Sequence, residues 1–369
     1  MKKRIVMTAL GAALCSAAVS AADIEIKPRG RFQLDGGVHN EDQTEFGDGF
    51  NVRRARIGVE GKLDQDWSFV IEYDFGDDGD AEAADALFRR NLGPGTVTIG
   101  HQRVPFSLNL LTSANSITFM ERASPTAALT LDRKLGVRYD VTNGDLTSQS
   151  MLFGRTMGDS DGDEKDQSAG GAQRLVFHPT VNDTLYHIGG AVALQTMGDY
   201  NSLRIRERPE VRIADSIRLI DTGSLDDVDS TARYGLELAM RQGPFSAEAE
   251  YIKLDLNSDL TGDLSFDGMH LQASYFLTGE SRAYKNAILG GVKPNSTAGA
   301  WELAIRYSDT NLTDRMVIGG EQQNITLGVN YYLTERVRFM GNLIFVDATL
   351  PDQTKDKPEV LAFRAQFHF

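Results

Sequence analysis

Apolar and polar residues alternate one by one along most of the chain, which is the pattern of β-strands that present one apolar face. In the clearest run, this face carries Trp67, Phe69, Ile71, Tyr73 and Phe75. The same alternation recurs over residues 135–141, 233–240, 268–277, 301–308 and 325–333. The runs are seven to ten residues long, close to the length of about ten that a tilted strand needs to cross a bilayer. The pattern predicts an all-β protein with about 16 antiparallel strands.

The connections between these runs differ in length. Short turns are predicted at 64–66, 93–95, 143–145, 182–183, 242–244 and 334–335. Long polar stretches fall between them, at 38–50, 77–84, 101–132, 157–171, 197–231, 255–265, 279–298, 309–323 and 347–357. Because a transmembrane β-barrel has short turns at one rim and long loops at the other, this alternation favours such a barrel. The pattern is least regular over residues 200–231.

The first 21 residues read as a secretory signal. The cations Lys2, Lys3 and Arg4 precede an apolar run over 5–14, and small residues then lead to a predicted cleavage site before Ala22. Residues 22–369 remain as one predicted barrel domain. They contain no apolar run of about 18 residues, so no helical membrane span is expected. Because the single cysteine, Cys15, lies inside the signal, the exported domain has neither disulfides nor thiolate ligands.

The last strand is a second marker of location. Leu361, Phe363, Ala365, Phe367 and Phe369 share one face of it. A terminal aromatic residue that ends an amphipathic strand resembles the assembly signal of bacterial outer-membrane barrels. A secreted β-sandwich or β-helix would also alternate, but the long acidic loops and the absence of disulfides favour the barrel in the outer membrane.

The composition narrows the class further. The chain is 41% hydrophobic and 24% charged, with 36 Gly and 10 Pro, which excludes disordered and collagen-like proteins. Its formal net charge is −14, and loss of the signal's three cations lowers it to −17. A nucleic-acid partner is therefore not expected. The six histidines are scattered without metal-ligand spacing, so no bound metal is expected. No serine lies in a nucleophile-elbow context, so neither enzymatic activity nor a cofactor is expected.

Arginines recur where the predicted barrel would face its lumen. They comprise Arg29 and Arg31, then Arg53, Arg54 and Arg56, and then Arg204, Arg206 and Arg208 at strict period two. Guanidinium groups stay charged and match oxyanions, so such rows suit an anion path. They could equally pair with wall carboxylates, for which the candidates are Glu60, Glu72, Glu237, Glu248 and Glu250. Arg53 and Arg54 are adjacent, so both can point inward only at a rim or a bulge.

The stretch 101–132 is long and, unlike the other long stretches, not obviously acidic. Such a loop after an early strand pair can fold into the lumen as a constriction. The alternative is an external loop that covers the barrel or contacts a neighbouring subunit.

Several segments resemble the phosphate-selective porins of the O and P type. They are Arg29–Asp35, Val52–Arg56, Arg204–Pro209, Ala247–Tyr251, Leu277–Lys285 and Gly299–Leu303. The resemblance implies a usually trimeric, sixteen-stranded outer-membrane barrel, with an arginine ladder that leads anions to a constriction formed by the third loop. By position, the ladder would include Arg31, Arg53, Arg54, Arg204, Arg206 and Arg208, with Arg122 from the loop and Lys253 as a basic wall residue. The sequence departs from the selective members at Ser107–Ser113, which holds no lysine.

The sequence thus predicts a passive outer-membrane channel for small anions such as phosphate, with Arg56 added to the ladder residues as pore lining. The alternative is an unselective or structural barrel whose acidic loops bind divalent cations, lipopolysaccharide or a partner.

Overall fold

The computed structural model describes residues 24–63, 66–76, 80–158, 166–199 and 201–369. The predicted signal peptide, the first two residues of the predicted turn at 64–66 and the acidic run at 159–164 lie outside these residues.

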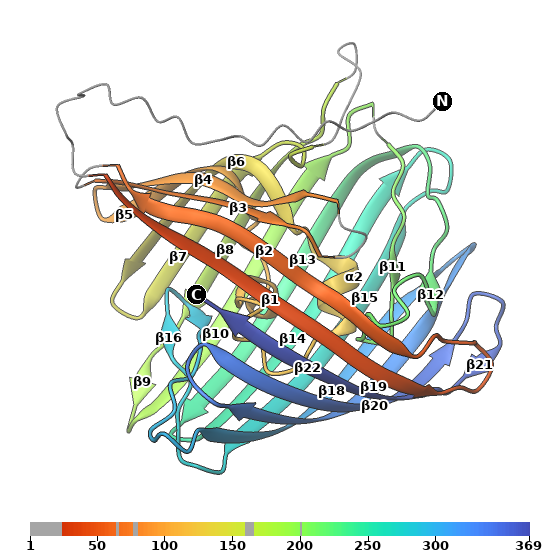
Figure 1. Ribbon diagram of the computed structural model, residues 1–369. Coiled ribbons are helices and arrows are strands. Elements are labelled where there is room, and N and C mark those ends of the chain that lie inside the picture. The colour runs from red at the N-terminus through yellow and green to blue at the C-terminus, as the bar shows by residue number, and fades with distance from the viewer. Residues whose placement is uncertain (1–23, 64–65, 77–79, 159–165, 200) are drawn as a thin grey trace, which may run out of the picture.

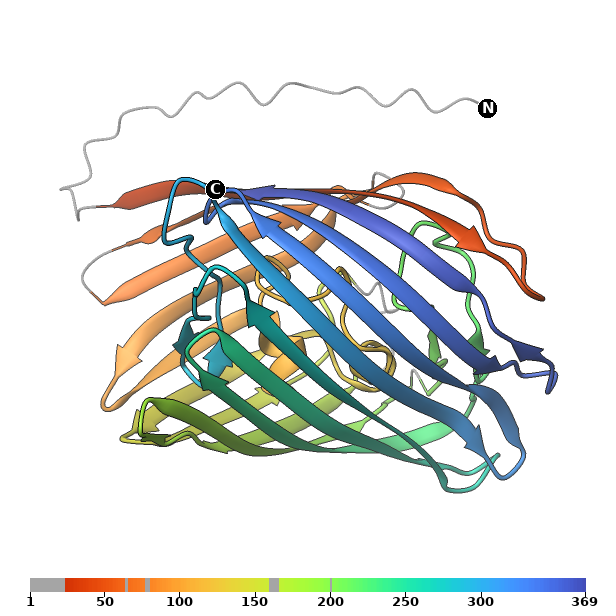
Figure 2. The same ribbon diagram turned by 90° about the horizontal axis from the view of Figure 1, so that it is seen from below.

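Sixteen antiparallel strands close into a barrel (Figures 1 and 2), as the alternation predicts. They are β1 (Glu25–Asn40), β2 (Gly49–Lys62), β3 (Trp67–Asp74), β4 (Glu82–Leu92), β5 (Gly95–Arg103), β6 (Arg133–Asn143), β7 (Leu146–Phe153), β8 (Ala169–Phe177), β10 (Thr184–Thr196), β13 (Val228–Gln242), β14 (Phe245–Ser258), β15 (Leu264–Phe276), β18 (Ala300–Asp314), β19 (Val317–Tyr332), β20 (Val337–Thr349) and β22 (Glu359–His368). The barrel closes where β1 pairs with β22. There the Gly30 and Phe369 backbones exchange two N–H···O bonds of 3.0 and 3.1 Å.

Six shorter strands complete the sheet structure. The segments β9 (Thr180–Val181) and β21 (Lys355–Asp356) extend the pairing of β10 and β20. Two small hairpins lie outside the barrel sheet, β11 (Arg206–Glu207) with β12 (Ile220–Asp221) and β16 (Tyr284–Lys285) with β17 (Ile288–Leu289). The helices α1 (Leu108–Leu111) and α2 (Ser124–Leu129) are short. No helix in the described ranges is long and apolar enough to span a membrane.

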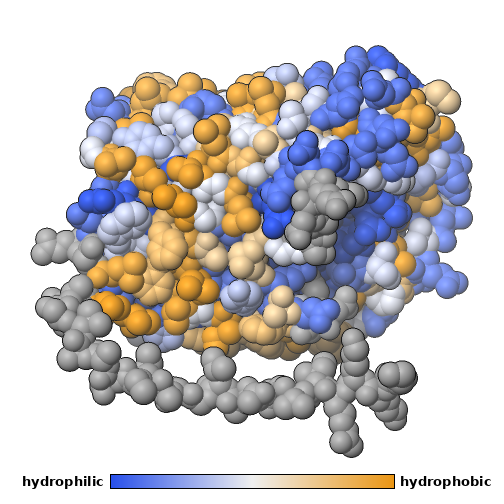
Figure 3. Space-filling view, turned by 90° about the horizontal axis from the view of Figure 1, so that it is seen from above, coloured by the Kyte–Doolittle hydropathy of each residue, from blue (hydrophilic) through white to orange (hydrophobic). Residues whose placement is uncertain are grey.

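The strands place apolar residues outward and polar residues inward over most of their length. In β19, Leu327 and Val329 are 44% and 39% exposed, whereas Thr326 and Asn330 are fully buried. Figure 3 shows hydrophobic residues over much of the outer face and hydrophilic residues gathered at one end of the barrel. An exposed apolar face on this scale is unfavourable in water and suits the hydrocarbon of a bilayer.

The two rims differ, and the predicted long stretches 309–323 and 279–298 depart from the expected alternation. Residues 93–94, 144–145, 243–244 and 333–336 form turns at one rim, and 41–48, 104–132, 197–227 and 350–358 form long connections at the other. The stretch 309–323 is mostly strand, because β18 and β19 meet at a turn of only two residues. The stretch 279–298 is long but belongs to the short-turn rim, where the Phe276 N–H donates to the Pro244 carbonyl at 3.1 Å.

Residues 104–132, loop L3 below, fold into the barrel and carry α1 and α2 (Figure 2). Phe106 and Leu129 of L3 lie in one buried apolar cluster with Ile252 and Leu254 of β14 and Phe266 of β15. Burial of this apolar surface stabilises the inward position of the loop. The predicted constriction loop is thereby confirmed.

Arginines of the barrel wall hold the backbone of L3. Arg338 donates to the Ile117 carbonyl at 2.8 Å, Arg306 to the Glu121 carbonyl at 3.0 Å and Arg233 to the Leu129 carbonyl at 2.9 Å. Arg364 and Arg282 donate likewise to the carbonyls of Met120 and Ser116. A loop in a lumen lacks the hydrogen bonds of a sheet, so these donors satisfy carbonyls that would otherwise be unpaired.

Glycines make room for L3 against the wall. A Cβ on Gly268 of β15 would lie 2.6 Å from Pro125 Cβ, and one on Gly328 of β19 would lie 3.0 Å from the Phe119 ring. Both distances are too short for ordinary contact, so the close approach of L3 requires glycine at these positions.

Candidate functional site

Two cavities lie against opposite sides of L3. The short-turn cavity, about 840 Å³, extends from Lys62 and Gly95 near the short-turn rim to Leu111 and Ala114 of L3. The long-loop cavity, about 250 Å³, extends from Glu82 and Val211 at the other rim to Leu110 and Arg122 of L3. A third cavity, of about 390 Å³, also contacts L3, at residues 128–132. L3 separates the short-turn cavity from the long-loop cavity, and these two are called chambers below.

Arg103 and Arg133 line both cavities. They are register partners at the ends of β5 and β6, where the chain enters and leaves L3. Arg133 Nε donates to Asp85 at 2.8 Å, and Asp132 lies 3.5 Å from Arg103 and 3.4 Å from Arg133. Burial alone would raise the pKa of Asp132, but the Arg133 and Arg103 charges outweigh it and lower the pKa. A charged arginine pair thus stands at the junction of the chambers.

Cations outnumber carboxylates in the short-turn cavity. Among the described residues that line it, the cations are Arg29, Arg31, Lys62, Arg89, Arg90, Arg103, Arg133 and Arg138, and the carboxylates are Asp66, Asp85 and Asp140. Arg89, Thr98 and Arg138 stand in register across β4, β5 and β6. The chamber therefore carries an excess of positive charge.

One buried carboxylate, Glu72, serves three arginines on this wall. Its oxygens lie 3.0 Å from Arg29, 3.3 Å from Arg56 and 3.9 Å from Arg31. Arg29 also pairs with Glu60, and Arg56 with Asp74 at 2.6 Å. Part of the predicted pairing between arginines and wall carboxylates is thus present, and it leaves Arg31 with the longest contact.

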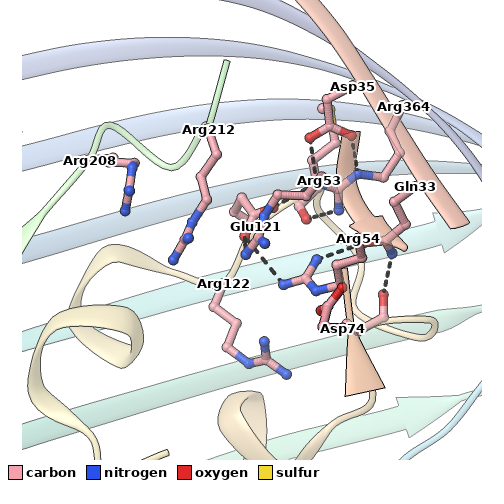
Figure 4. A network of polar contacts seen from close by, with 12 residues as sticks. Gln33, Asp35, Arg53, Arg54, Asp74, Glu121, Arg122, Arg208, Arg212 and Arg364 are labelled. Carbon is pink, nitrogen blue, oxygen red and sulfur yellow. Dashed lines mark hydrogen bonds and ion pairs between the residues drawn. The ribbon is translucent and has the colours of Figure 1, made fainter. Parts of the chain in front are cut away.

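A second carboxylate, Glu121 of L3, reaches the arginines of β2 from inside the barrel (Figure 4). It accepts hydrogen bonds from Arg53 Nε at 2.8 Å and Arg364 Nη2 at 2.6 Å, and it lies 3.8 Å from Arg54. Burial would raise the pKa of Glu121, but the three guanidinium groups, led by Arg53, hold it well below its ordinary value. Glu121 is therefore an internal counter-ion of this cluster.

Arg53 and Arg54 both point inward because the β1–β2 pairing has a bulge. Gln33 pairs with Arg54 and Leu34 with Val52, so the register passes over Arg53. Both arginines are buried. Arg54 also donates to Gln33 Oε1 at 2.7 Å.

Arg122 faces the long-loop cavity and holds the end of α1. It donates to the carbonyls of Asn109, Leu110 and Thr112 at 3.1, 3.1 and 2.8 Å. Burial, and then the Arg103 charge, lowers the pKa of Arg122. The guanidinium thus fixes α1 at the site where the family pattern has a lysine.

Arg204, Arg206 and Arg208 do not share a strand face. They lie in the connection 197–227, where β11 contains only Arg206 and Glu207. Arg204 is exposed and pairs with Asp221 at 2.5 Å, Arg206 is exposed, and Arg208 is buried beside Asp215 at 2.7 Å. Their period-two spacing belongs to an irregular loop that packs across the long-loop rim, so the predicted row is wrong.

Lys253 lies on the outer face, so its predicted position on the lumen wall is also wrong. In β14 the buried inward residues are Ile252, Leu254 and Leu256, which pack in the cluster beneath L3. Lys253 therefore points outward, where its Nζ lies 2.9 Å from Asp255.

The sequence interpretation missed Arg89, Arg103, Arg133 and Arg138. Arg103 and Arg133 flank L3 directly, so their position beside a predicted constriction loop was an available signal. Arg89 shares the inward face of β4 with Asp85, and Arg138 shares that of β6 with Asp140, so neither strand shows an unbalanced charge in the sequence. Only the register brings the two arginines together.

One group of described residues has the donor types of a metal site. Glu248, Glu250 and His270 have donor atoms within 4.8 Å of one another. Their oxygens already receive bonds from L3, since the Asn109 N–H donates to Glu250 at 2.6 Å and Asn109 Nδ2 to Glu248 at 2.9 Å. The group therefore anchors α1 to the wall.

Comparisons with known proteins agree with this architecture. The family model described as phosphate-selective porin O and P matches residues 26–369. Porin O of Pseudomonas aeruginosa is 29% identical over 87% of this chain and 82% of its own. The anion-selective porin of Comamonas acidovorans has a similar structure, with a TM-score of 0.56 and 16% identity over 94% of this chain and all of its own. OmpT of Vibrio cholerae, solved in a trimer form, also has a similar structure, with a TM-score of 0.60 and 10% identity over 94% of this chain and 99% of its own.

Proposed function

The chain belongs to the phosphate-selective porin O and P family and is an outer-membrane porin channel, and from this premise we propose that its passage favours small anions, phosphate and related oxyanions above all. The observation that carries the proposal is the position of Arg103 and Arg133, which line both chambers. A solute that crosses L3 passes beside their guanidinium groups, which stay charged and offer paired donors to an oxyanion.

The charge of the walls supports the same direction. The short-turn chamber has a cation excess inside a chain whose formal net charge is −14. A water-filled passage with fixed positive charge concentrates anions and repels cations. No bond is made or broken in this process, so the family and the fold point to a channel and not to an enzyme.

Assembly and surroundings are part of the proposal. A homotrimer is supported by OmpT, which has a similar fold and was solved in a trimer form. Cleavage before Ala22 would release the barrel for insertion. Outward carboxylates such as Asp255 and Asp267, on β14 and β15, suit a contact with lipopolysaccharide through divalent cations.

Phosphate is expected to reduce the chloride current through the purified protein in a planar bilayer. An oxyanion that pairs with Arg103 and Arg133 stays longer than chloride and excludes it meanwhile. The measurement is the chloride conductance during a phosphate titration at constant ionic strength, with a neutral solute of similar size as the control. An unselective barrel, the alternative function, would show the same conductance with both additions.

A further inference from the structure

We propose that Glu248, Glu250 and His270 form a site for a divalent transition-metal ion of the Zn²⁺ class, between the barrel wall and L3. Glu248 and Glu250 lie two residues apart on the inward face of β14, and His270 stands opposite Glu250 on β15. The ion would strengthen the anchor that already fixes α1 to the wall. This proposal goes beyond the channel function and does not depend on which ions the channel favours.

The two glutamates carry buried charge that no neighbouring cation neutralises. Glu248 and Glu250 are each 4% exposed, and neither forms an ion pair with an arginine or lysine in the described part of the chain. By contrast Glu237, the nearest buried carboxylate on β13, lies 2.7 Å from Arg174. Two buried carboxylates without a counter-charge are strongly unfavourable, and one divalent cation would supply both of the missing charges.

The bonds from L3 leave coordinating atoms available. The Asn109 N–H donates to Glu250 Oε1, and Asn109 Nδ2 donates to Glu248 Oε1. Glu248 Oε2 accepts no hydrogen bond from any described residue. His270 Nε2 lies 3.1 Å from Glu248 Oε1, while the buried Nδ1 of the same ring has no partner among the described residues. Because a carboxylate has about four acceptor positions, anchoring by Asn109 and coordination of a metal are compatible.

An unpaired acceptor beside the cluster is the independent sign of a cation. Gln272, the register partner of Glu248 on β15, is 6% exposed, and its Oε1 has no hydrogen-bond partner within the described ranges. Gln272 shares the inward face of β15 with His270. Buried acceptors are normally satisfied, and a bound ion would satisfy this oxygen directly or through a water that it holds.

The donor types and their spacing favour an ion such as Zn²⁺. The three donor atoms lie within 4.8 Å of one another, and the pair formed by His270 and Glu248 is 3.1 Å apart. Tetrahedral Zn²⁺, with bonds of about 2.0–2.2 Å, places its ligand atoms about 3.3–3.6 Å apart, so side-chain rotations can close the site. One imidazole with two carboxylates suits Zn²⁺ and related ions, whereas Mg²⁺ and Ca²⁺ prefer oxygen ligands alone.

A similar histidine–glutamate pair on the neighbouring strands β10 and β13 provides an internal comparison. His187 Nε2 lies 3.1 Å from Glu237, the same distance as in the proposed site. Here, however, Arg174 neutralises Glu237, and the Tyr284 hydroxyl lies 2.8 Å from His187 Nδ1. Both ring nitrogens of His187 are thus in use and the carboxylate already has its counter-ion, so no metal is expected at this pair.

The test is the zinc content of the purified protein without an affinity tag, refolded with Zn²⁺ after chelator treatment and then desalted. A single tightly bound Zn²⁺ per chain is expected by elemental mass spectrometry. His270→Gln and Glu250→Gln should each weaken zinc affinity at least tenfold, since loss of even an outer partner of a metal site costs about 10–100-fold. Glu250→Gln keeps an acceptor for the Asn109 N–H, so it should still fold. His187→Gln is the matched control and should retain the ion.

Thermal unfolding gives a second readout, because an ion that binds only the folded state raises the unfolding midpoint. Zn²⁺ should raise it in the unmodified protein and in His187→Gln, but not in His270→Gln. An unmodified protein that retains no zinc would overturn the site and mean that a proton neutralises the carboxylates. Equal zinc affinity in the unmodified protein and in His270→Gln would also overturn it, because the ion would then lie elsewhere. Neither result bears on the anion preference, which the reversal potential measures separately.

Discussion

Arg103→Glu is expected to lower the permeability ratio of chloride to potassium about tenfold. Arg103 lines both chambers beside L3, so on the proposed path the reversed charge lies where ions cross the loop. Two unit charges about 4 Å apart in water interact by about 1 kcal/mol, so a two-unit change is worth about 2 kcal/mol before screening by salt. The ratio is obtained from the reversal potential under a potassium chloride gradient.

Lys253→Glu is the matched control, because it makes the same two-unit change on the outer face of β14. It should leave the ratio unchanged. Arg103→Lys keeps the charge and should keep most of the anion preference. An equal shift for Arg103→Glu and Lys253→Glu would mean that total charge, and not the junction of the chambers, sets the preference.

Glu121→Ala is expected to destabilise the folded barrel by about 3 kcal/mol, because removal of one partner of a buried ion pair leaves the other charges uncompensated. Arg53, Arg54 and Arg364 would then lose the carboxylate that they share, and Arg364 would keep Asp35. L3 would lose its bonds to Arg53 and to the Arg364 Nη2, so the single-channel current should also become noisier. The thermal unfolding midpoint in detergent, followed by circular dichroism, measures the loss.

Added phosphate should restore part of the stability of Glu121→Ala, because an anion that binds only the folded cluster shifts unfolding by mass action. Glu335→Ala, an exposed glutamate in the turn 333–336, is the control and should unfold near the unmodified protein in either buffer. A loss of stability in Glu121→Ala that phosphate does not reduce would contradict the role of Glu121 as counter-ion.

The depressed pKa of Glu121 gives the same cluster a pH dependence. A carboxyl whose pKa is lower in the folded state stabilises it above the unfolded pKa, about 4.3, and this contribution is lost as pH falls toward the folded pKa. The difference in stability between the unmodified protein and Glu121→Ala should therefore be constant above about pH 5 and shrink only in stronger acid.

The barrel itself was predictable because membrane strands repeat every two residues and the lipid selects apolar side chains for one face. The rule that apolar residues face outward fails in part of β14. There Ile252 and Leu254 turn inward, since L3 fills that side of the lumen with an apolar cluster. Lys253 lies between them and therefore points to the outside. The contacts of L3, and not the strand pattern alone, thus decide which face of β14 points into the lumen.

The partners of the ion pairs could not be predicted from the sequence, because they also depend on the fold of L3. Glu121 is separated by more than sixty residues from Arg53 and by far more from Arg364, and only the inward fold of L3 brings them together. The spacing of Arg204, Arg206 and Arg208 misled in the opposite direction. Residues at every second position suggest a strand face, but these three lie in a loop where β11 contains only two residues. The length of a connection also did not indicate its rim correctly in every case. The long stretch 279–298 belongs to the short-turn rim.

The most direct measurement is the reversal potential of the purified, refolded protein in a planar bilayer under a potassium chloride gradient. If Arg103 and Arg133 govern the passage, the reversal potential is shifted from zero toward the equilibrium potential of chloride. In Arg103→Glu this shift should become smaller. A potential at zero or on the potassium side in the unmodified protein would contradict the anion path and leave a porin whose passage is governed by its carboxylates.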